Sequence, residues 1–167
     1  MVSLTLREHS DRLLADVASA VRRHYGDRLV SLVVFGSMGR GTQRSDSDLD
    51  LLIVADGLPQ GRLARVEDFA PVEAALAPRL EDGRRAGFPT ECSPVFKTPN
   101  EVLAGSPLLL DMVDDARILH DPEGVLAGRL GRLRARLAEL GARRVPHGGG
   151  WYWELKPDLK PGEVFTL

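Results

Sequence analysis

The first 25 residues carry apolar side chains at helical spacing. The positions that recur on one helical face are Leu6, Leu13, Leu14, Val17 and Val21. Gly26 follows where a helix often ends. The pattern predicts an amphipathic helix over Leu4–Tyr25.

Three later segments have the composition of buried strands. Leu29–Phe35 is a compact run rich in β-branched residues, and Asp48–Val54 is a second apolar run with a polar start. Phe88–Phe96 is the third, with Pro89 and Pro94 near its two ends. Because proline cannot donate to a strand ladder, the third strand is predicted at a sheet edge or at a bulge.

Helical patterns separate and follow these strands. Residues 61–80 are rich in Ala and Leu, and Pro71 is predicted to break or restart that helix, since a proline inside a helix costs about 3 kcal/mol. A short helix near Pro107–Asp114, a strand at Ala116–His120 and a longer helix over Pro122–Leu140, ended by Gly141, complete the pattern.

The C-terminal segment combines glycines with rigid aromatic residues. Gly148–Gly150 is predicted to act as a hinge before an aromatic tail. Trp151 and Trp153 alternate onto one face of that tail, where packing on the core is favoured over stacking on a base or a partner.

Together these elements predict an α/β fold, in which a small twisted mixed β-sheet is flanked by helices. The chain has 167 residues, which suits a single domain over 1–167. Its core is expected at about 1–120, with the C-terminal helix and the aromatic tail at 121–167.

Composition bears on the cellular compartment, on cysteine chemistry and on polynucleotide binding. No apolar run approaches the roughly 18 residues of a membrane span, and acidic residues come too early for a secretory signal, so a cytoplasmic protein without membrane contact is expected. The lone Cys92 excludes an internal disulfide and a thiolate cluster. A net charge of −2 lacks the basic excess that polynucleotide binding normally needs.

Two aspartates at the start of the second strand are the main chemical signal. Asp48 and Asp50 lie two residues apart, so they project from the same face of the strand with Cα atoms roughly 6.6 Å apart. Two carboxylates this close repel each other unless a cation lies between them. A hard divalent ion such as Mg²⁺ fits, because it takes oxygen ligands and tolerates phosphate oxygens and water.

A glycine–serine pair ends the preceding strand. Gly36 permits close approach of the backbone to a ligand, and Ser37 adds a hydroxyl donor. Arg40, Arg44 and Ser47 follow within reach of a triphosphate. A phosphate-binding turn and a cation site are therefore predicted side by side.

The segment FGSMGRGTQRSDSDLDLLIV, residues 35–54, resembles the signature of the DNA polymerase β-like nucleotidyltransferase superfamily, and its shortness resembles the minimal nucleotidyltransferase branch. The resemblance implies that Asp48 and Asp50 bind metal and that Gly36–Ser37 binds phosphate. It also implies a third carboxylate on a later strand, for which Glu91 is the best candidate. Gly39 stands where the family more often has alanine.

The same resemblance implies a reaction, its cofactors and its partners. It implies transfer of a nucleoside monophosphate from an NTP, with ATP favoured, to an acceptor hydroxyl on a protein or small molecule. Two Mg²⁺ ions are expected, with Mn²⁺ as an alternative. A helical toxin-like protein of a toxin–antitoxin pair is the implied partner, and a homo-oligomer stays open.

Two alternatives keep the fold and change the function. The first is a non-catalytic, antitoxin-like binding protein, against which the retention of both aspartates and Ser37 argues. The second is a small-molecule adenylyltransferase of the aminoglycoside type. A calcium loop starting at Asp46 is excluded, because its sixth residue is Leu51 and its twelfth is Gly57.

Overall fold

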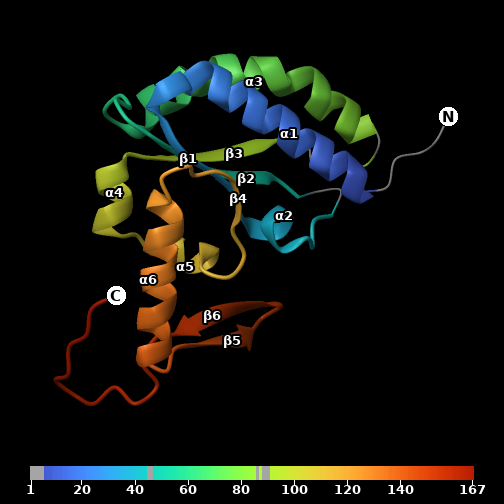
Figure 1. Cartoon of the computed structure of the whole chain (residues 1–167). Helices are drawn as coiled ribbons and strands as arrows, with labels where there is room; N and C mark the ends of the chain where they lie inside the picture. Colours follow the sequence, from blue (N-terminus) through green and yellow to red (C-terminus); the bar gives the residue numbers. More distant parts are fainter. Residues whose placement is uncertain (1–5, 45–46, 86, 88–90) are drawn as a thin grey trace.

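The computed structural model describes residues 6–44, 47–85, 87 and 91–167. Its core is a four-stranded sheet between two layers of helices (Figure 1). Helices α1 (Leu6–Tyr25) and α3 (Arg62–Arg85) cover one face of the sheet. Helices α4 (Pro99–Ala104), α5 (Leu108–Met112) and α6 (Val125–Glu139) lie against the other.

The sheet is mixed, as the sequence predicts. Its strands are β1 (Leu29–Val34), β2 (Leu49–Ala55), β3 (Cys92–Lys97) and β4 (Arg117–His120), in the order β3-β2-β1-β4. Strand β1 runs antiparallel to β2 and β4, and β2 runs parallel to β3. The expected α/β class is confirmed, and β3 with its internal Pro94 lies at an edge.

Alternation along β2 sorts its side chains between two apolar clusters. Leu49, Leu51 and Ile53 pack with α1 and α3. Leu52 and Val54 pack on the opposite face with α5 and α6. Because side chains two residues apart share a face, Asp50 belongs to the α5 and α6 face.

The predicted break at Pro71 is wrong. Helix α3 is continuous through Pro71 and Pro78, both of which are exposed. On the opposite side of the same helix, Phe69, Val72 and Leu76 are almost fully buried in the cluster shared with α1. Burial of three such side chains gives roughly 1.5–3 kcal/mol each, which offsets the cost of an interior proline.

Helix α4 was not predicted, although its start carries a recognisable signal. The Thr98 side chain accepts a hydrogen bond from the Glu101 amide (3.2 Å), and the Glu101 carboxylate accepts one from the Thr98 amide (2.8 Å). Pro99 occupies the first turn. Thr-Pro-x-Glu is thus a capping box with proline at the first helical position.

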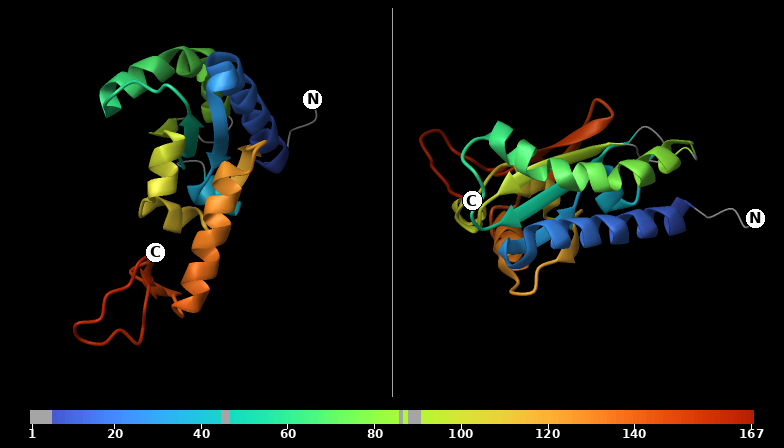
Figure 2. Two further views of the ribbon diagram at one scale, coloured as in Figure 1. Left: turned by 60° about the vertical axis from the view of Figure 1, so that its left-hand side comes forward. Right: turned by 90° about the horizontal axis from the view of Figure 1, so that it is seen from above.

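The predicted hinge is a tight hairpin turn. Strands β5 (Arg143–His147) and β6 (Gly150–Glu154) pair antiparallel, and the residues between them, Gly148 and Gly149, have φ values of +58° and +81°. Two consecutive positive φ values define the mirror-image turn that suits a two-residue hairpin. The hairpin and the tail lie at the far end of α6 (Figures 1 and 2).

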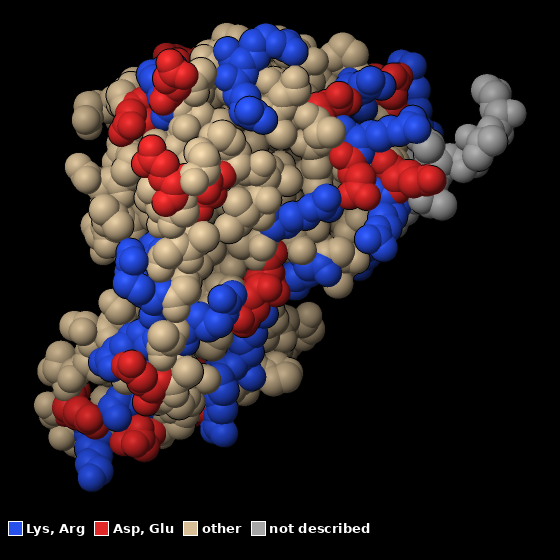
Figure 3. All heavy atoms as spheres, viewed as in Figure 1, with Lys and Arg blue, Asp and Glu red and all other residues tan. Residues whose placement is uncertain are grey.

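The aromatic residues of this hairpin pack inward. Trp151 and Trp153 share a face, with ring centroids 6.2 Å apart. Trp153 packs against the apolar cluster of α6, which agrees with the predicted core packing. Lys and Arg side chains are concentrated over α6 and the hairpin, interspersed with acidic ones (Figure 3). In the part of the chain that the structure describes, no helix is long and apolar enough to cross a membrane.

Candidate active site

The turn after β1 is built against the start of β2. The Phe35 amide donates to the Asp50 carbonyl (3.1 Å), which fixes the end of β1 beside Asp50. Gly36 has a φ of +64°, a conformation that favours glycine. A Cβ atom at residue 36 would lie 2.1 Å from Oδ2 of Asp50. The backbone of the turn therefore touches the carboxylate directly.

A single helical turn, α2 (Gly36–Arg40), follows that glycine. Met38 is buried beneath it, and Gly41 ends it with a φ of +71°. The Ser37 carbonyl accepts from the Thr42 amide (2.9 Å), which ties the next loop to the turn. These contacts hold the predicted Gly36–Ser37 pair in a defined conformation.

The two aspartates differ in their environments. Asp48 is exposed and lies just before β2, whereas Asp50 is half-buried within β2. Burial raises the pKa of Asp50, the neighbouring Asp48 carboxylate raises it further, and Arg40 lowers it. The two carboxylates therefore repel each other in the protein alone, which is the donor arrangement that a divalent cation stabilises.

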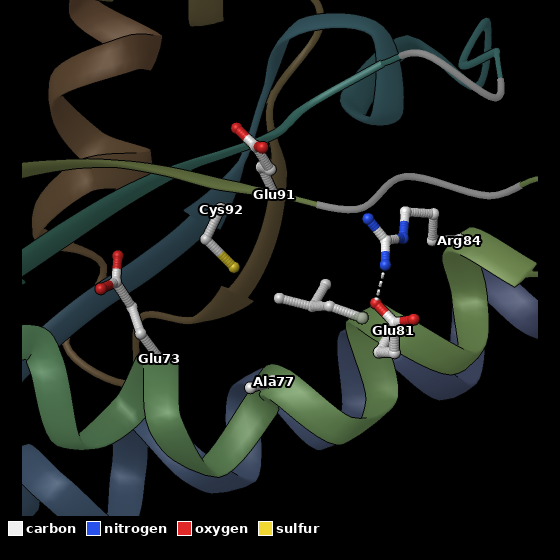
Figure 4. Close-up of a pocket in the computed structure, with 7 residues that line it drawn as sticks. Glu73, Ala77, Glu81, Arg84, Glu91 and Cys92 are labelled. Atoms are coloured by element: carbon white, nitrogen blue, oxygen red, sulfur yellow. Dashed lines mark hydrogen bonds and ion pairs between the residues drawn. The ribbon is translucent and has the colours of Figure 1, made fainter.

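Glu91 directly precedes the adjoining strand β3, as Asp48 directly precedes β2. The Leu49 amide donates to the Glu91 carbonyl (2.9 Å), and the next pair in the ladder joins Leu49 and Cys92. Glu91 points away from α3, while the Cys92 sulfur points toward it (Figure 4). The carboxylate is thus on the face that carries Asp48 and Asp50. Among the described residues, however, no three His, Cys, Asp or Glu side chains approach closely enough to hold a metal ion.

The remaining predicted residues surround the turn. Arg40 is exposed, and its Nη1 lies 3.5 Å from Oδ2 of Asp115. The Arg44 amide donates to the Ser47 hydroxyl oxygen (2.9 Å), and the Ser47 amide donates to the Arg44 carbonyl (3.1 Å). These two hydrogen bonds join Arg44 to Ser47, the residue before Asp48. Ser47 was predicted to donate to phosphate, and accepting from Arg44 leaves its O–H hydrogen for a second partner.

Two residues near the turn were not predicted. Asp115, between α5 and β4, has a side chain only 10% exposed and pairs with both Arg40 and Arg144. Because Asp114 and Asp115 are consecutive, the sequence at this point is typical of a solvent-exposed acidic loop. Arg144 is one of many arginines near the C-terminus. The spacing of Arg40, Asp115 and Arg144 in the sequence does not predict their contacts, because these depend on how the C-terminal hairpin packs near α2.

A cavity of about 400 Å³ opens on the other face of β3. Its lining includes Cys92, Glu81 and Arg84 (Figure 4). Burial, and to a lesser extent the nearby Glu73 carboxylate, raise the pKa of the Cys92 thiol to about 12. Cys92 is therefore a packing residue rather than a nucleophile, in agreement with the interpretation of the sequence.

Comparison with known proteins agrees with this geometry. Residues 14–85 match the family described as "Nucleotidyltransferase domain". A candidate protein adenylyltransferase of Methanocaldococcus jannaschii is 28% identical over 126 residues, covering 74% of this chain and 80% of that protein. The match to the family includes the Gly36 turn and both aspartates.

Two solved structures are similar to part of this chain. One is a toxin–antitoxin structure with AMP-PNP, at 18% identity, with 77% of this chain and 92% of that chain covered and a TM-score of 0.48. The other is a candidate nucleotidyltransferase of Sulfolobus solfataricus, at 18% identity, 73% and 92% coverage and a TM-score of 0.43. The family match over residues 14–85 and the similarity to the M. jannaschii protein support a nucleotidyltransferase of the DNA polymerase β-like superfamily.

Proposed function

We propose that the protein transfers AMP from ATP to a hydroxyl group of a protein side chain. The observation that carries this proposal is the direct contact between the Gly36 turn and the Asp50 carboxylate. A phosphate-binding backbone and a cation-binding carboxylate must lie together if a nucleotide triphosphate and its metal ions are to bind at one place.

In this proposal Asp48 and Asp50 hold divalent ions, and Glu91, directly before β3, supplies a further carboxylate. The ions, when bound, neutralise phosphate charge and stabilise the attacking and leaving oxygens. The backbone of Asp50 is fixed by its pairing with Ser93 of β3 and by the hydrogen bond from Phe35, so it needs little reorganisation to accept a cation. The exposure of Asp48 keeps its carboxylate open to solvent and to a nucleotide.

The phosphate side is assigned to Gly36, Ser37, Arg40, Arg44 and Ser47. The turn orients the α-phosphate, and the arginines offset the charge of the β- and γ-phosphates. The acceptor oxygen forms a bond to the α-phosphorus, the bond to the bridging oxygen breaks, pyrophosphate leaves and the hydroxyl proton passes to solvent. Every residue in this step lies at the β1–α2 and β2 ends of the sheet.

A protein acceptor is supported by the M. jannaschii relative, whose name describes a candidate protein adenylyltransferase. The charge distribution argues in the same direction. Several arginines of α6 and the hairpin are paired with acids, namely Arg134 with Asp114, Arg136 with Glu139 and Arg143 with Glu154. Cations already neutralised in this way contribute less to binding a phosphate backbone. The helical toxin-like partner stays a prediction.

The test offers ATP labelled at the α-phosphate to the full chain with Mg²⁺ and three acceptor classes: an extract of proteins from the source cells, an aminoglycoside, and tRNA with short oligonucleotides. Label on a protein band supports the proposal. Label on the aminoglycoside or the nucleic acid changes the acceptor but keeps the chemistry. Absence of label from all three, together with absence of MgATP binding, supports the non-catalytic alternative.

A further inference from the structure

Asp115 joins three parts of the molecule that are far apart in sequence. It follows α5, and its carboxylate lies 3.5 Å from Nη1 of Arg40 and 3.1 Å from Nη1 of Arg144. Its side chain is only 10% exposed, compared with 36% for Arg40 and 23% for Arg144. A carboxylate this well covered gains more from its cation partners than an exposed one does.

The backbone of Asp115 also touches the phosphate-binding turn. A Cβ atom on Gly39 would lie 2.2 Å from the Asp115 carbonyl oxygen and 3.1 Å from that of Val34. Helix α2 is therefore seated against residue 115 with no space for a side chain between them. The side chain and the backbone of Asp115 thus both contact the C-terminal end of α2, through Arg40 and Gly39.

The other partner of Asp115 is held by the C-terminal hairpin. The Arg144 guanidinium lies 4.1 Å from the ring centroid of Trp151 and 5.3 Å from that of Trp153. Stacking on two indole rings restricts the orientation of a guanidinium. The hairpin therefore fixes Arg144, Arg144 pairs with Asp115, and Asp115 pairs with Arg40.

Loss of this carboxylate would change the surroundings of the aspartate pair. Arg40 is close enough to Asp50 to interact with it electrostatically. Without Asp115, the Arg40 and Arg144 guanidinium groups would repel each other, and Arg40 would be left with Asp50 and Asp111, the other carboxylates with which it interacts electrostatically. A shift of Arg40 toward Asp50 would neutralise the site that the cations need and would move Arg40 from its place beside the phosphates.

We propose that Asp115 is a positioning residue, which holds Arg40 and α2 for nucleotide binding and connects them, through Arg144, to the C-terminal hairpin. This inference rests on the proposed function, because its effect is measured on ATP. Asp115 does not touch the reacting atoms. Its contribution is the orientation of Arg40 and the seating of α2.

The experiment compares Asp115→Asn with a matched control, Asp16→Asn. Asp16 pairs with Arg79 (2.9 Å) between α1 and α3, away from the turn. Asp115→Asn is expected to raise the KM for ATP about tenfold, as loss of a charge-assisted hydrogen bond would, with kcat within about twofold of wild type. Asp16→Asn should leave both constants unchanged. An unchanged KM in a folded Asp115→Asn protein overturns the inference.

A double-variant cycle separates positioning from a general structural role. In a protein that already carries Arg40→Ala, Asp115→Asn should raise the KM less than about twofold, because its partner is gone. The same tenfold effect in that background would overturn the role assigned to Arg40. Should Asp115→Asn not fold, Arg144→Ala tests the connection to the hairpin: a raised KM supports it and a wild-type KM overturns it.

Nucleotide binding by the wild type distinguishes failure of the proposed function from failure of the positioning role of Asp115. Binding of MgATP or AMP-PNP is measured calorimetrically beside the assay. If the wild type binds nucleotide and transfers AMP, but Asp115→Asn has the same KM and kcat as the wild type, the positioning role is contradicted. The proposed function is then unaffected. If the wild type neither binds nucleotide nor transfers AMP, the proposed function fails, and the positioning role fails with it.

Discussion

The carboxylate of Asp50 occupies the space that a side chain at Gly36 would need. A Cβ atom there would lie 2.1 Å from Oδ2 and 3.0 Å from Cγ of Asp50. Gly36, the first residue of α2, and Asp50 of β2 are therefore packed as a pair. A glycine is required here by the approach of the carboxylate as well as by its positive φ.

Gly36→Ala should consequently abolish transfer, because the new methyl group must displace the Asp50 carboxylate. Gly26→Ala is the matched control: Gly26 also has a positive φ, +54°, but nothing lies within 4 Å of a Cβ placed there. Both variants should lose roughly 1–2 kcal/mol of stability from backbone strain. Only Gly36→Ala should also lose activity, by more than about 100-fold. Equal activity of the two variants in the transfer assay would show that the contact is unimportant.

Gly39→Ala should destabilise the protein even though the family more often has alanine at this position. The methyl group would meet two backbone carbonyl oxygens, those of Asp115 and Val34, which cannot rotate away. We expect the free energy of unfolding to fall by about 1–3 kcal/mol, as it does at overpacked sites. Thermal unfolding of Gly39→Ala and the wild type measures this difference.

Gly131→Ala on the exposed face of α6 is the control for that variant, since nothing lies within 4 Å of its Cβ. It should instead stabilise by about 0.5–1 kcal/mol, the usual gain of alanine over glycine in a helix. A Gly39→Ala protein as stable as the wild type would mean that α2 is not seated on residue 115 as described.

Asp50→Asn should remove transfer while stabilising the metal-free protein at neutral pH. The pKa of Asp50 is raised by burial and by Asp48, so the folded state disfavours the charged form. For an acid with a raised folded pKa, stability falls as the pH rises from the unfolded pKa through the folded one. The stabilisation by asparagine should therefore disappear below about pH 4, where aspartate is protonated in both states.

Unfolding curves with EDTA and with Mg²⁺ check this expectation. Added Mg²⁺ should stabilise the wild type more than Asp50→Asn, because the wild type retains both carboxylate ligands. A variant that is less stable than the wild type at pH 7 without metal would contradict the repulsion between Asp48 and Asp50.

Glu101→Gln tests the charge of Glu101, with the opposite pH dependence, because glutamine can still accept from the Thr98 amide in the capping box of α4. The Glu101 pKa is lowered to about 2, first by the hydrogen bond from Arg65 and then by the amide of Thr98. A lowered folded pKa gives stability that is present above about pH 4.3 and is lost as the pH falls toward 2. The substitution should lower the free energy of unfolding by about 1 kcal/mol at neutral pH, a modest amount because Glu101 is partly exposed.

The control for Glu101→Gln is Glu139→Gln, which removes an exposed pair with Arg136 and should change stability little. The free energies of unfolding of wild type and Glu101→Gln should converge as the pH approaches 2. A difference that persists unchanged at pH 2 would contradict the role of the Glu101 charge.

The sequence predicted much of this molecule because its signals are local. Alternation in Leu49–Val54 sorted the core residues and placed both aspartates on one face, which depends only on the period of a strand. The prediction of a hinge at Gly148–Gly150 was wrong, because two glycines between short strands also suit a hairpin turn. Strand β5, the partner of β6, was not predicted. The break at Pro71 was wrong because tertiary burial outweighed a local penalty.

The site was predictable to the extent that its residues follow one another in sequence. Gly36 and Asp50 were found through spacing and resemblance. Asp115 and Arg144 were not, since their contacts with α2 depend on how the hairpin packs. The Glu91 position agrees with a third carboxylate on the correct face, and its role stays a prediction.

Nucleotidyl transfer at the Gly36 and Asp50 site is tested most directly by following the α-phosphate of ATP in the wild type and in Asp50→Asn. The wild type with Mg²⁺ and a protein acceptor should transfer label from ATP labelled at the α-position and none from ATP labelled at the γ-position. Asp50→Asn should transfer neither. Transfer of the γ-label by the wild type, or undiminished transfer of the α-label by Asp50→Asn, would contradict nucleotidyl transfer at the Gly36 and Asp50 site.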